Sequence, residues 1–187
     1  MNDVQDNIEN AIHKAEEHLP VEAIDRFRKI FSPEDYIEVL QSFSKPKPII
    51  FRINTLQATE AIVLKELSSS GLEVTPFPWC PLGYKLENGT IRDLQALRAG
   101  KEGWIYIQAA SSMTAAHAMQ VEKGMSVLDM CAAPGSKTTQ LAAALNNTGI
   151  LIANDRSKKR LYRLREVLQL QNATQVEVLC GGGERLG

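Results

Sequence analysis

The C-terminal part of the chain alternates between apolar runs and amphipathic runs, and this alternation restricts its fold more than any other feature. Three short runs have the apolar character of buried strands, and the two runs between them have helical spacing: 126–130, 137–145, 150–154, 157–170 and 175–179. Such a strand and helix series is typical of a parallel, doubly wound sheet with helical crossovers. We therefore expect residues 103–187 to form a Rossmann-like α/β domain.

The N-terminal part has helical spacing almost throughout. Residues 5–19 carry apolar side chains at helical intervals, and a second short helix is expected to end near Phe31. Ser32 followed by Pro33 is a helix-start signal, because serine caps a helix and proline suits its first turn. Residues 1–46 are therefore predicted to be a helical segment.

The middle of the chain, 47–102, mixes short β-branched runs with a helix predicted at 59–69 and a turn at Asn88-Gly89. We expect a small α+β domain there. The apolar run "WIYIQ", which follows Gly103, is assigned to the C-terminal domain as a further strand.

Composition excludes several classes of protein. No apolar run approaches the roughly 20 residues that span a bilayer, and the acidic start lacks the order of a signal peptide, so a cytoplasmic location is expected and no membrane partner. Cys80, Cys131 and Cys180 are odd in number and widely spaced, which fits neither a disulfide framework nor a zinc site. We expect reduced thiols and no metal. The net charge of −1 combines an acidic start with a mildly basic remainder, which permits a polyanionic partner.

The stretch "VLDMCAAPGSKTTQLA", from Val127 to Ala142, joins the first strand of the α/β series to its helix. Ligands of such sheets bind beyond the carboxyl ends of the strands. Small side chains let a ligand approach the backbone, Gly135 can adopt a positive φ, and a helix N-terminus attracts anionic groups. The candidate ligand-binding residues of this junction are Cys131, Ala132, Ala133, Pro134, Gly135, Ser136 and Lys137.

Two carboxylates lie near this junction. Asp155 follows the second strand, where a carboxylate can accept hydrogen bonds from ribose hydroxyls, although it could instead cap the next helix. Asp129 could contact the ligand or hold the amides of the loop. The phosphate-binding P-loop and the dinucleotide glycine fingerprint are both absent. A nucleoside with a zwitterionic end, as in S-adenosylmethionine, fits these residues, and NAD is a more remote option.

The segments "FRINTL", "TPFPWCPLGY", "YIQAASSM", "VLDMCAAPGSKTTQLA" and "ILIANDRSKKRLYRL" resemble the Sun/Nop family of RNA (cytosine-5-)methyltransferases, in its bacterial ribosomal-RNA branch. The resemblance implies an incomplete Rossmann-like methyltransferase domain, preceded by a small α+β RNA-binding domain and the helical segment. It implies that Cys131 to Lys137 hold S-adenosylmethionine, that Asp155 binds its ribose, and that Arg160 lies near the cofactor or RNA. Lys45, Lys47 and Arg52 flank or occupy a strand of the RNA-recognition-like domain and would contact RNA.

The family attacks C6 of cytosine with a cysteine in a Thr-Cys pair and uses a second cysteine in a Pro-Cys pair for release. Neither pair occurs in this sequence, and Gly182 stands where the family usually has an adenine-contacting aspartate. Cys131 is expected to be a small packed thiol. We therefore interpret the chain as an N-terminal fragment, inactive by itself, of an enzyme that methylates C5 of cytidine in ribosomal RNA. The alternative is an inactive RNA-binding or ribosome-binding module. No obligate protein partner is evident.

Overall fold

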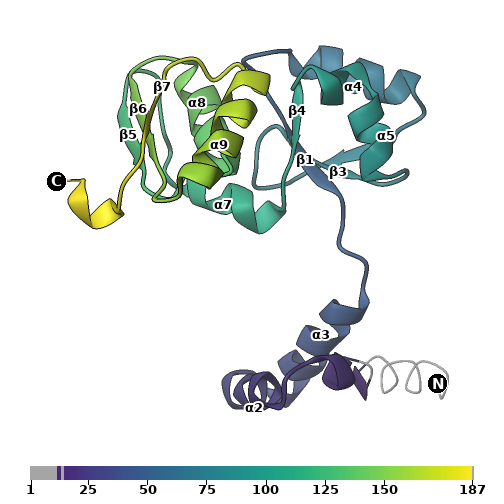
Figure 1. Ribbon diagram of the computed structural model, residues 1–187. Coiled ribbons are helices and arrows are strands. Elements are labelled where there is room, and N and C mark those ends of the chain that lie inside the picture. The colour runs from purple at the N-terminus through teal and green to yellow at the C-terminus, as the bar shows by residue number, and fades with distance from the viewer. Residues whose placement is uncertain (1–11, 14, 187) are drawn as a thin grey trace. The chain divides into compact units, whose positions relative to one another are not determined.

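The computed structural model describes residues 12–13 and 15–186, without the side chain of Ser44. The chain divides into two compact units, Met1–Lys47 and Pro48–Gly187. Figure 1 shows both units with their helices and strands labelled. Among the described helices, none combines the length and the apolar character that a membrane span would need.

The described part of the first unit is helical. Residues 12–13 and 15–18 are in a helix, and α2 (Val21–Ile30) and α3 (Pro33–Ser44) follow. The Ser32 hydroxyl accepts a hydrogen bond of 3.1 Å from the Asp35 amide, which confirms the predicted start of α3. The predicted start of the first helix, at residue 5, lies outside the described residues.

The second unit begins with a four-stranded antiparallel sheet. Its strands are β1 (Ile50–Ile53), β2 (Val74–Pro76), β3 (Gly83–Leu86) and β4 (Ile105–Ile107), in the order β2-β3-β1-β4. Three helices accompany it: α4 (Glu60–Ser69), α5 (Ile91–Ala96) and α6 (Arg98–Lys101). Phe51 and Ile53 of β1 pack in one buried cluster with Val63 and Leu67 of α4. This part of the chain therefore has a core of its own.

The strand β4 corrects one expectation. The run "WIYIQ" was predicted to belong to the C-terminal domain, whereas Phe51 of β1 pairs with Ile107 and Ile53 pairs with Ile105 in antiparallel register. The first sheet therefore extends past the predicted boundary at residue 102 and ends no earlier than Ile107. Helices α5 and α6 were not predicted either, although Thr90 and Asp93 form a capping box at the start of α5.

The rest of the second unit contains the predicted parallel sheet, in the order β5-β6-β7. Its elements agree with the predicted runs to within about a residue: β5 (Ser126–Asp129), α8 (Ser136–Leu145), β6 (Ile150–Asn154), α9 (Lys158–Leu170) and β7 (Val176–Leu179). Helix α7 (Ala110–Ala118) precedes them. The side-chain amide of Gln140, on α8, donates a hydrogen bond of 3.2 Å to the backbone carbonyl of Met113, on α7.

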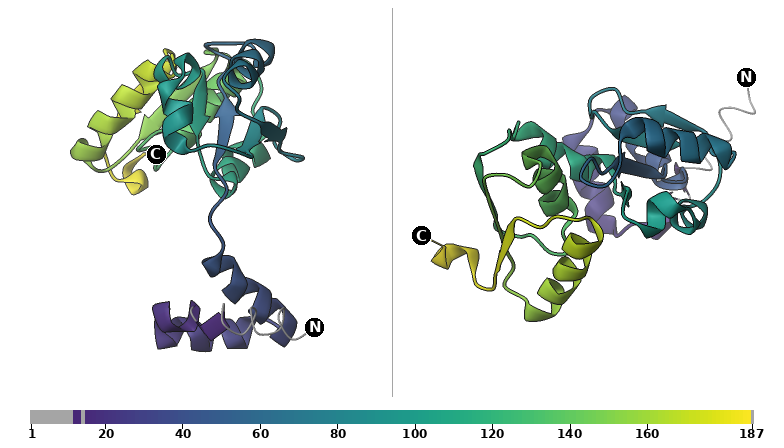
Figure 2. Two further views of the ribbon diagram at one scale, coloured as in Figure 1. Left: turned by 90° about the vertical axis from the view of Figure 1, so that its right-hand side faces the viewer. Right: turned by 90° about the horizontal axis from the view of Figure 1, so that it is seen from above.

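Helices α8 and α9 lie on the same side of the parallel sheet (Figures 1 and 2). The side chains on that side, including Val127, Leu151 and Ala153, are buried in one cluster. On the strands β5 and β6, Leu128 and Ile150 are 42% and 55% exposed. Parallel sheets are usually covered on both faces. The described part of this sheet is therefore covered on one face only.

Candidate functional site

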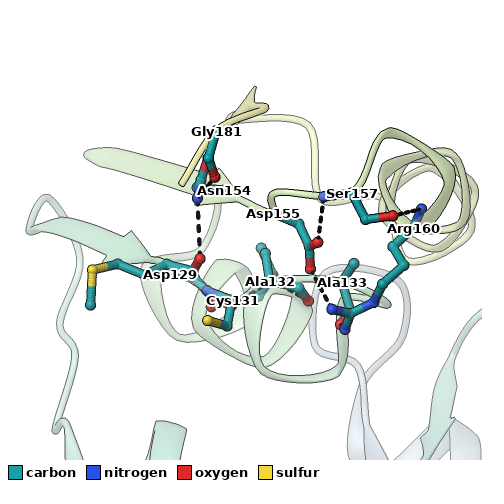
Figure 3. A network of polar contacts seen from close by, with 11 residues as sticks. Asp129, Cys131, Ala132, Ala133, Asn154, Asp155, Ser157, Arg160 and Gly181 are labelled. Atoms are coloured by element: carbon teal, nitrogen blue, oxygen red, sulfur yellow. Dashed lines mark hydrogen bonds and ion pairs between the residues drawn. The ribbon is translucent and has the colours of Figure 1, made fainter. Parts of the chain in front are cut away.

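The carboxyl ends of the three parallel strands surround a cavity of about 600 Å³. Register pairs Asp129 with Ala153 and Asn154 with Leu179, so the three strands end at nearly the same level. Cys131 follows β5, Asp155 follows β6 and Gly181 follows β7, and all three residues line the cavity. The sheet thus brings two of the predicted site residues from separate loops to one place (Figure 3).

The loop between β5 and α8 depends on Gly135 for its conformation. Gly135 caps α8 with φ of +114° and ψ of 6°. A Cβ at this position would lie 3.0 Å from Leu164 Cδ1 and 3.1 Å from Val167 Cγ1, both on α9. Glycine is therefore required both by the backbone conformation and by the close approach of α9.

Asp129 holds the shape of this loop. One carboxylate oxygen accepts a hydrogen bond of 3.3 Å from the Cys131 amide, and the other accepts one of 2.7 Å from the Thr138 hydroxyl. Asp129 is not among the residues lining the cavity. Of its two predicted roles, the contacts favour loop organisation.

Asp155 is a buried carboxylate, only 2% exposed. Its Oδ1 accepts a hydrogen bond of 3.0 Å from the Ser157 amide, and its Oδ2 lies 3.0 Å from Arg160 Nη1 in an ion pair. The alternative that Asp155 caps α9 is not what the structure shows, because Ser157 is the capping residue and its hydroxyl accepts from the Arg160 amide.

Arg160 ties the loop after β5 to the end of β6. Its guanidinium donates a short hydrogen bond from Nη2 to the Ala133 carbonyl while Nη1 pairs with Asp155. Figure 3 shows the side chain of Arg160 extending from α9 toward both groups. Arg160 also lines the cavity, and its side chain is 56% exposed.

We expect Arg160→Gln to lower the free energy of unfolding by about 1–2 kcal/mol, since it leaves a buried carboxylate without its cation. The partial exposure of Arg160 keeps the loss below that of a fully buried pair. Urea unfolding followed by circular dichroism measures the change. Arg163→Gln is the matched control on the same helix, because the Arg163–Glu166 pair is exposed on both sides. Equal losses in the two variants would contradict the structural role of Arg160.

Asn154 is a site residue that was not predicted from the sequence. It is fully buried, and its side-chain amide donates to the Met130 carbonyl at 3.2 Å and to the Gly181 carbonyl at 3.0 Å. The backbone carbonyl of Asn154 accepts from the Ala132 amide at 2.9 Å. One residue therefore links the ends of all three strands (Figure 3). An asparagine at the end of the otherwise apolar run "ILIAN" was the available signal.

The remaining residues of the predicted loop lie around the cavity in different ways. Ala132 and Ala133 are buried behind it, and Lys137 in the first turn of α8 does not line it. Pro134 is exposed and Ser136 begins α8. Cys131 is exposed, so its prediction as a packed thiol is wrong.

Glu184 also contributes a carboxylate to the cavity wall. Gly182 has no side chain to offer there, and a Cβ built on it would collide with the Glu184 carboxylate. The cavity is thus lined by two carboxylates, Asp155 and Glu184, and two guanidinium groups, Arg156 and Arg160. Such a mixed lining suits a zwitterion. In the described ranges no group of three His, Cys, Asp or Glu side chains could hold a metal ion.

The three residues predicted to contact RNA have different environments. Lys45 and Lys47 are exposed in the first unit. Arg52, in β1 of the second unit, is 3% exposed and donates hydrogen bonds to Gln108 at 3.2 Å and to Thr139 at 2.6 Å. The polar head of Arg52 is therefore engaged in the interior, and its contact with RNA stays a prediction.

Two family models match the chain. Residues 20–91 match the RsmF/B-like methyltransferase ferredoxin-like domain, and residues 116–186 match "16S rRNA methyltransferase RsmB/F". A ferredoxin-like domain followed by part of a Rossmann-like methyltransferase domain confirms the predicted fold class.

Curated relatives include ribosomal RNA small subunit methyltransferase F of Pectobacterium atrosepticum, 38% identical over 154 residues, and that of Shewanella loihica, 35% identical over 144 residues. The alignments cover 76% and 74% of this chain but only 31% and 30% of the relatives. The chain therefore spans about 30% of the length of these relatives.

Solved structures give the same fold. A methyltransferase homologue protein from Pyrococcus horikoshii is 29% identical with a TM-score of 0.80, over 94% of this chain and 56% of that one. NSun6 from Pyrococcus horikoshii is 19% identical with a TM-score of 0.77, over 86% of this chain and 65% of that one. The second likeness shows the fold alone.

Proposed function

We propose, because this chain belongs to the 16S rRNA methyltransferase RsmB/F family, that it is the N-terminal part of an enzyme that methylates C5 of a cytidine in ribosomal RNA, with S-adenosylmethionine as the methyl donor. The observation that carries the proposal is the cavity at the ends of β5, β6 and β7, where a buried carboxylate meets a loop of small residues. A ribosomal RNA substrate would place the protein in the cytoplasm.

The residues of the cavity fit S-adenosylmethionine in size and charge. Its volume of about 600 Å³ lies in the range of small-molecule sites. Asp155 and Glu184 suit the ribose hydroxyls and the cationic groups of the cofactor, and Arg156 suits its carboxylate. Arg160 contacts both the Ala133 carbonyl of the loop and Asp155 after β6, so these two sides of the cavity are held together before a ligand binds. When bound, the cofactor supplies an electrophilic methyl group.

The chemistry of transfer needs more than this cavity. C5 of cytosine becomes nucleophilic only after a thiolate adds to C6, and the resemblance assigns that step to cysteines in Thr-Cys and Pro-Cys pairs. Cys80, Cys131 and Cys180 stand in neither pair. Cys131 lines the cavity, but we assign it a place in the cofactor loop rather than nucleophilic attack. These 187 residues should bind the cofactor and leave RNA unmethylated.

We expect Asp155→Asn to weaken S-adenosylmethionine binding tenfold or more, because hydrogen bonds to a charged acceptor contribute about 1.5–3 kcal/mol. The amide oxygen of asparagine can still accept from the Ser157 amide, so the local turn is preserved. Isothermal titration calorimetry of both proteins measures the affinities. Glu177→Gln, which removes a carboxylate from an exposed position of β7, is the matched control.

The same titrations separate the two candidate functions. Wild-type binding that Asp155→Asn abolishes and Glu177→Gln preserves supports a cofactor site. RNA binding by a chain that shows no heat with S-adenosylmethionine would favour an inactive RNA-binding module, for which the missing cysteine pairs are the motivating observation. Incorporation of a labelled methyl group into RNA by the purified 187 residues would contradict their assignment as a non-catalytic part.

A further inference from the structure

A second cavity, of about 340 Å³, lies in the second unit between the antiparallel sheet and helices α7 and α8. Its walls come from β1 and the turn before β3 on one side and from α7 and α8 on the other. The lining residues that concern its chemistry are Arg52, Cys80, His117, Gln120, Gln140 and Ala144. It shares no lining residue with the cavity at the ends of β5, β6 and β7.

Arg52 is a buried cation in the wall of this cavity, and its contacts are with uncharged groups. Its Nε donates to Gln108 and its Nη2 to Thr139, and its guanidinium lies 5.1 Å from the centre of the Tyr106 ring. No acidic side chain of the residues that the structure describes forms an ion pair with it. Burial lowers the pKa of Arg52 to about 10, so the group stays charged at neutral pH. A buried charge without a counter-ion is unfavourable, and an anion in the cavity would relieve this.

The rest of the lining also suits an anion. It contains the imidazole of His117 and the amides of Gln120 and Gln140, but no aspartate or glutamate. The cavity can therefore offer hydrogen-bond donors to a small oxyanion without opposing it with a carboxylate. A phosphate group matches this chemistry, because arginine is well suited to phosphate oxygens.

An aromatic ring beside the cavity points to a nucleic acid as the source of the phosphate. Trp79 is 39% exposed, and its ring centre lies 6.1 Å from that of His117, which lines the cavity. The ring is fixed from another side by an edge contact with Phe77 at 5.5 Å. Exposed aromatic rings next to a cationic groove stack on the bases of single-stranded nucleic acids.

We propose that this cavity binds one phosphate group of single-stranded RNA, with Arg52 as its counter-charge and with a neighbouring base stacked on Trp79. The inference rests on the proposed function, which supplies RNA as the partner, and adds a defined contact for it. In this proposal Arg52 contacts RNA from the wall of a cavity, in which its guanidinium is buried.

The test replaces Ala144, an exposed residue of α8 that lines the cavity, with glutamate. Ala144→Glu places a carboxylate at the cavity and leaves the hydrogen bonds of Arg52 intact, and Ala144→Gln is the uncharged control of the same size. Fluorescence anisotropy of a labelled single-stranded RNA oligonucleotide should show at least about fivefold weaker binding for Ala144→Glu and less than about twofold for Ala144→Gln. Trp79→Ala should weaken binding by about fivefold or more.

A second measurement uses inorganic phosphate alone. Phosphate should raise the melting temperature of the wild type and of Ala144→Gln relative to chloride at equal ionic strength, and should not raise that of Ala144→Glu. Arg52→Met, checked for folding by circular dichroism, should behave like Ala144→Glu. Phosphate stabilisation combined with RNA binding that neither Ala144→Glu nor Trp79→Ala weakens would overturn the RNA assignment.

Failure of this inference differs from failure of the proposed function. A chain that binds S-adenosylmethionine and RNA, but binds RNA equally well with Ala144→Glu, contradicts the phosphate site alone. A chain that gives no calorimetric signal with S-adenosylmethionine contradicts the proposed function, whatever its RNA affinity.

Discussion

Gly135→Ala should lower the free energy of unfolding of the second unit by about 3 kcal/mol. An L-residue held at φ of +114° costs about 1–2 kcal/mol, and forcing a methyl group into a packed interior adds about 1–3 kcal/mol. The added Cβ would stand 3.0 Å and 3.1 Å from Leu164 and Val167, which are themselves buried. Neither side chain can give way into solvent.

Gly71→Ala is the matched control for this change. Gly71 has a φ of +73° and follows α4, but a Cβ there would meet no atom within 4 Å. It should therefore cost only the backbone term, about 1 kcal/mol. Urea unfolding of the three proteins gives the difference, which isolates the packing term. Equal losses in Gly135→Ala and Gly71→Ala would show that α9 does not constrain the loop.

Gly135→Ala should also weaken the binding of S-adenosylmethionine by the loop between β5 and α8. The Cβ pushes the loop away from α9, and Arg160 on that helix holds the Ala133 carbonyl. We expect S-adenosylmethionine affinity of Gly135→Ala to fall together with stability. A double-mutant cycle with Val167→Ala, which removes one of the two crowded side chains, should show a favourable coupling energy because the packing term is shared.

The sequence pattern predicted the elements of the parallel sheet, from β5 to β7, to within about a residue. The run Ile150–Asn154 has the bounds of β6, and the small-residue loop with Gly135 takes the positive φ expected of it. These features depend on neighbouring residues and on turn chemistry. Asp155 and Cys131 could be placed near each other from the rule that strand ends of a parallel sheet share one edge.

The predictions were wrong where segments far apart in the sequence determine the pairing of a strand or the burial of a side chain. The sequence around β4 cannot show that it pairs with β1, more than fifty residues earlier in the chain. The burial of Arg52 depends on Gln108 and Thr139, which lie 56 and 87 residues away in the sequence. A charged side chain in a strand is usually solvated, and only the packing of the two sheets makes this one internal.

Asn54→Ala should lower the free energy of unfolding by about 3 kcal/mol, because Asn54 joins the segment before β4 to the end of α9. It is fully buried, and its side-chain amide donates to the carbonyls of Gly103 and Gln171, each at 2.9 Å. Its Oδ1 accepts from the Leu56 amide at 3.2 Å. Removing the side chain leaves the Gln171 carbonyl and the Leu56 amide without this partner, at about 1 kcal/mol or more each, whereas the Gly103 carbonyl keeps its hydrogen bond from Gln171 Nε2.

Gln171 makes the effect of Asn54→Ala larger than local. Its side chain is buried and donates to the carbonyls of Gly103 and Ile105, so the end of α9 is fixed to the start of β4 from both sides. Without the Asn54 side chain, fewer hydrogen bonds connect α9, which packs on the parallel sheet, to the segment that leads into β4 of the antiparallel sheet. We expect unfolding of the variant to become less cooperative, with hydrogen exchange at the end of α9 accelerating more than exchange in β1.

Asn88→Ala is the control that tests whether the burial of the Asn54 side chain determines how much its hydrogen bonds stabilise the fold. Asn88 also makes two backbone contacts with its side chain, accepting from the Glu73 amide at 2.8 Å and donating to the Gly71 carbonyl at 3.0 Å, but it is exposed. Water can replace these partners, so the loss should stay below about 1 kcal/mol. If Asn88→Ala and Asn54→Ala shift the urea midpoint equally, the buried hydrogen bonds of Asn54 to Gly103 and Gln171 add no more to stability than exposed ones.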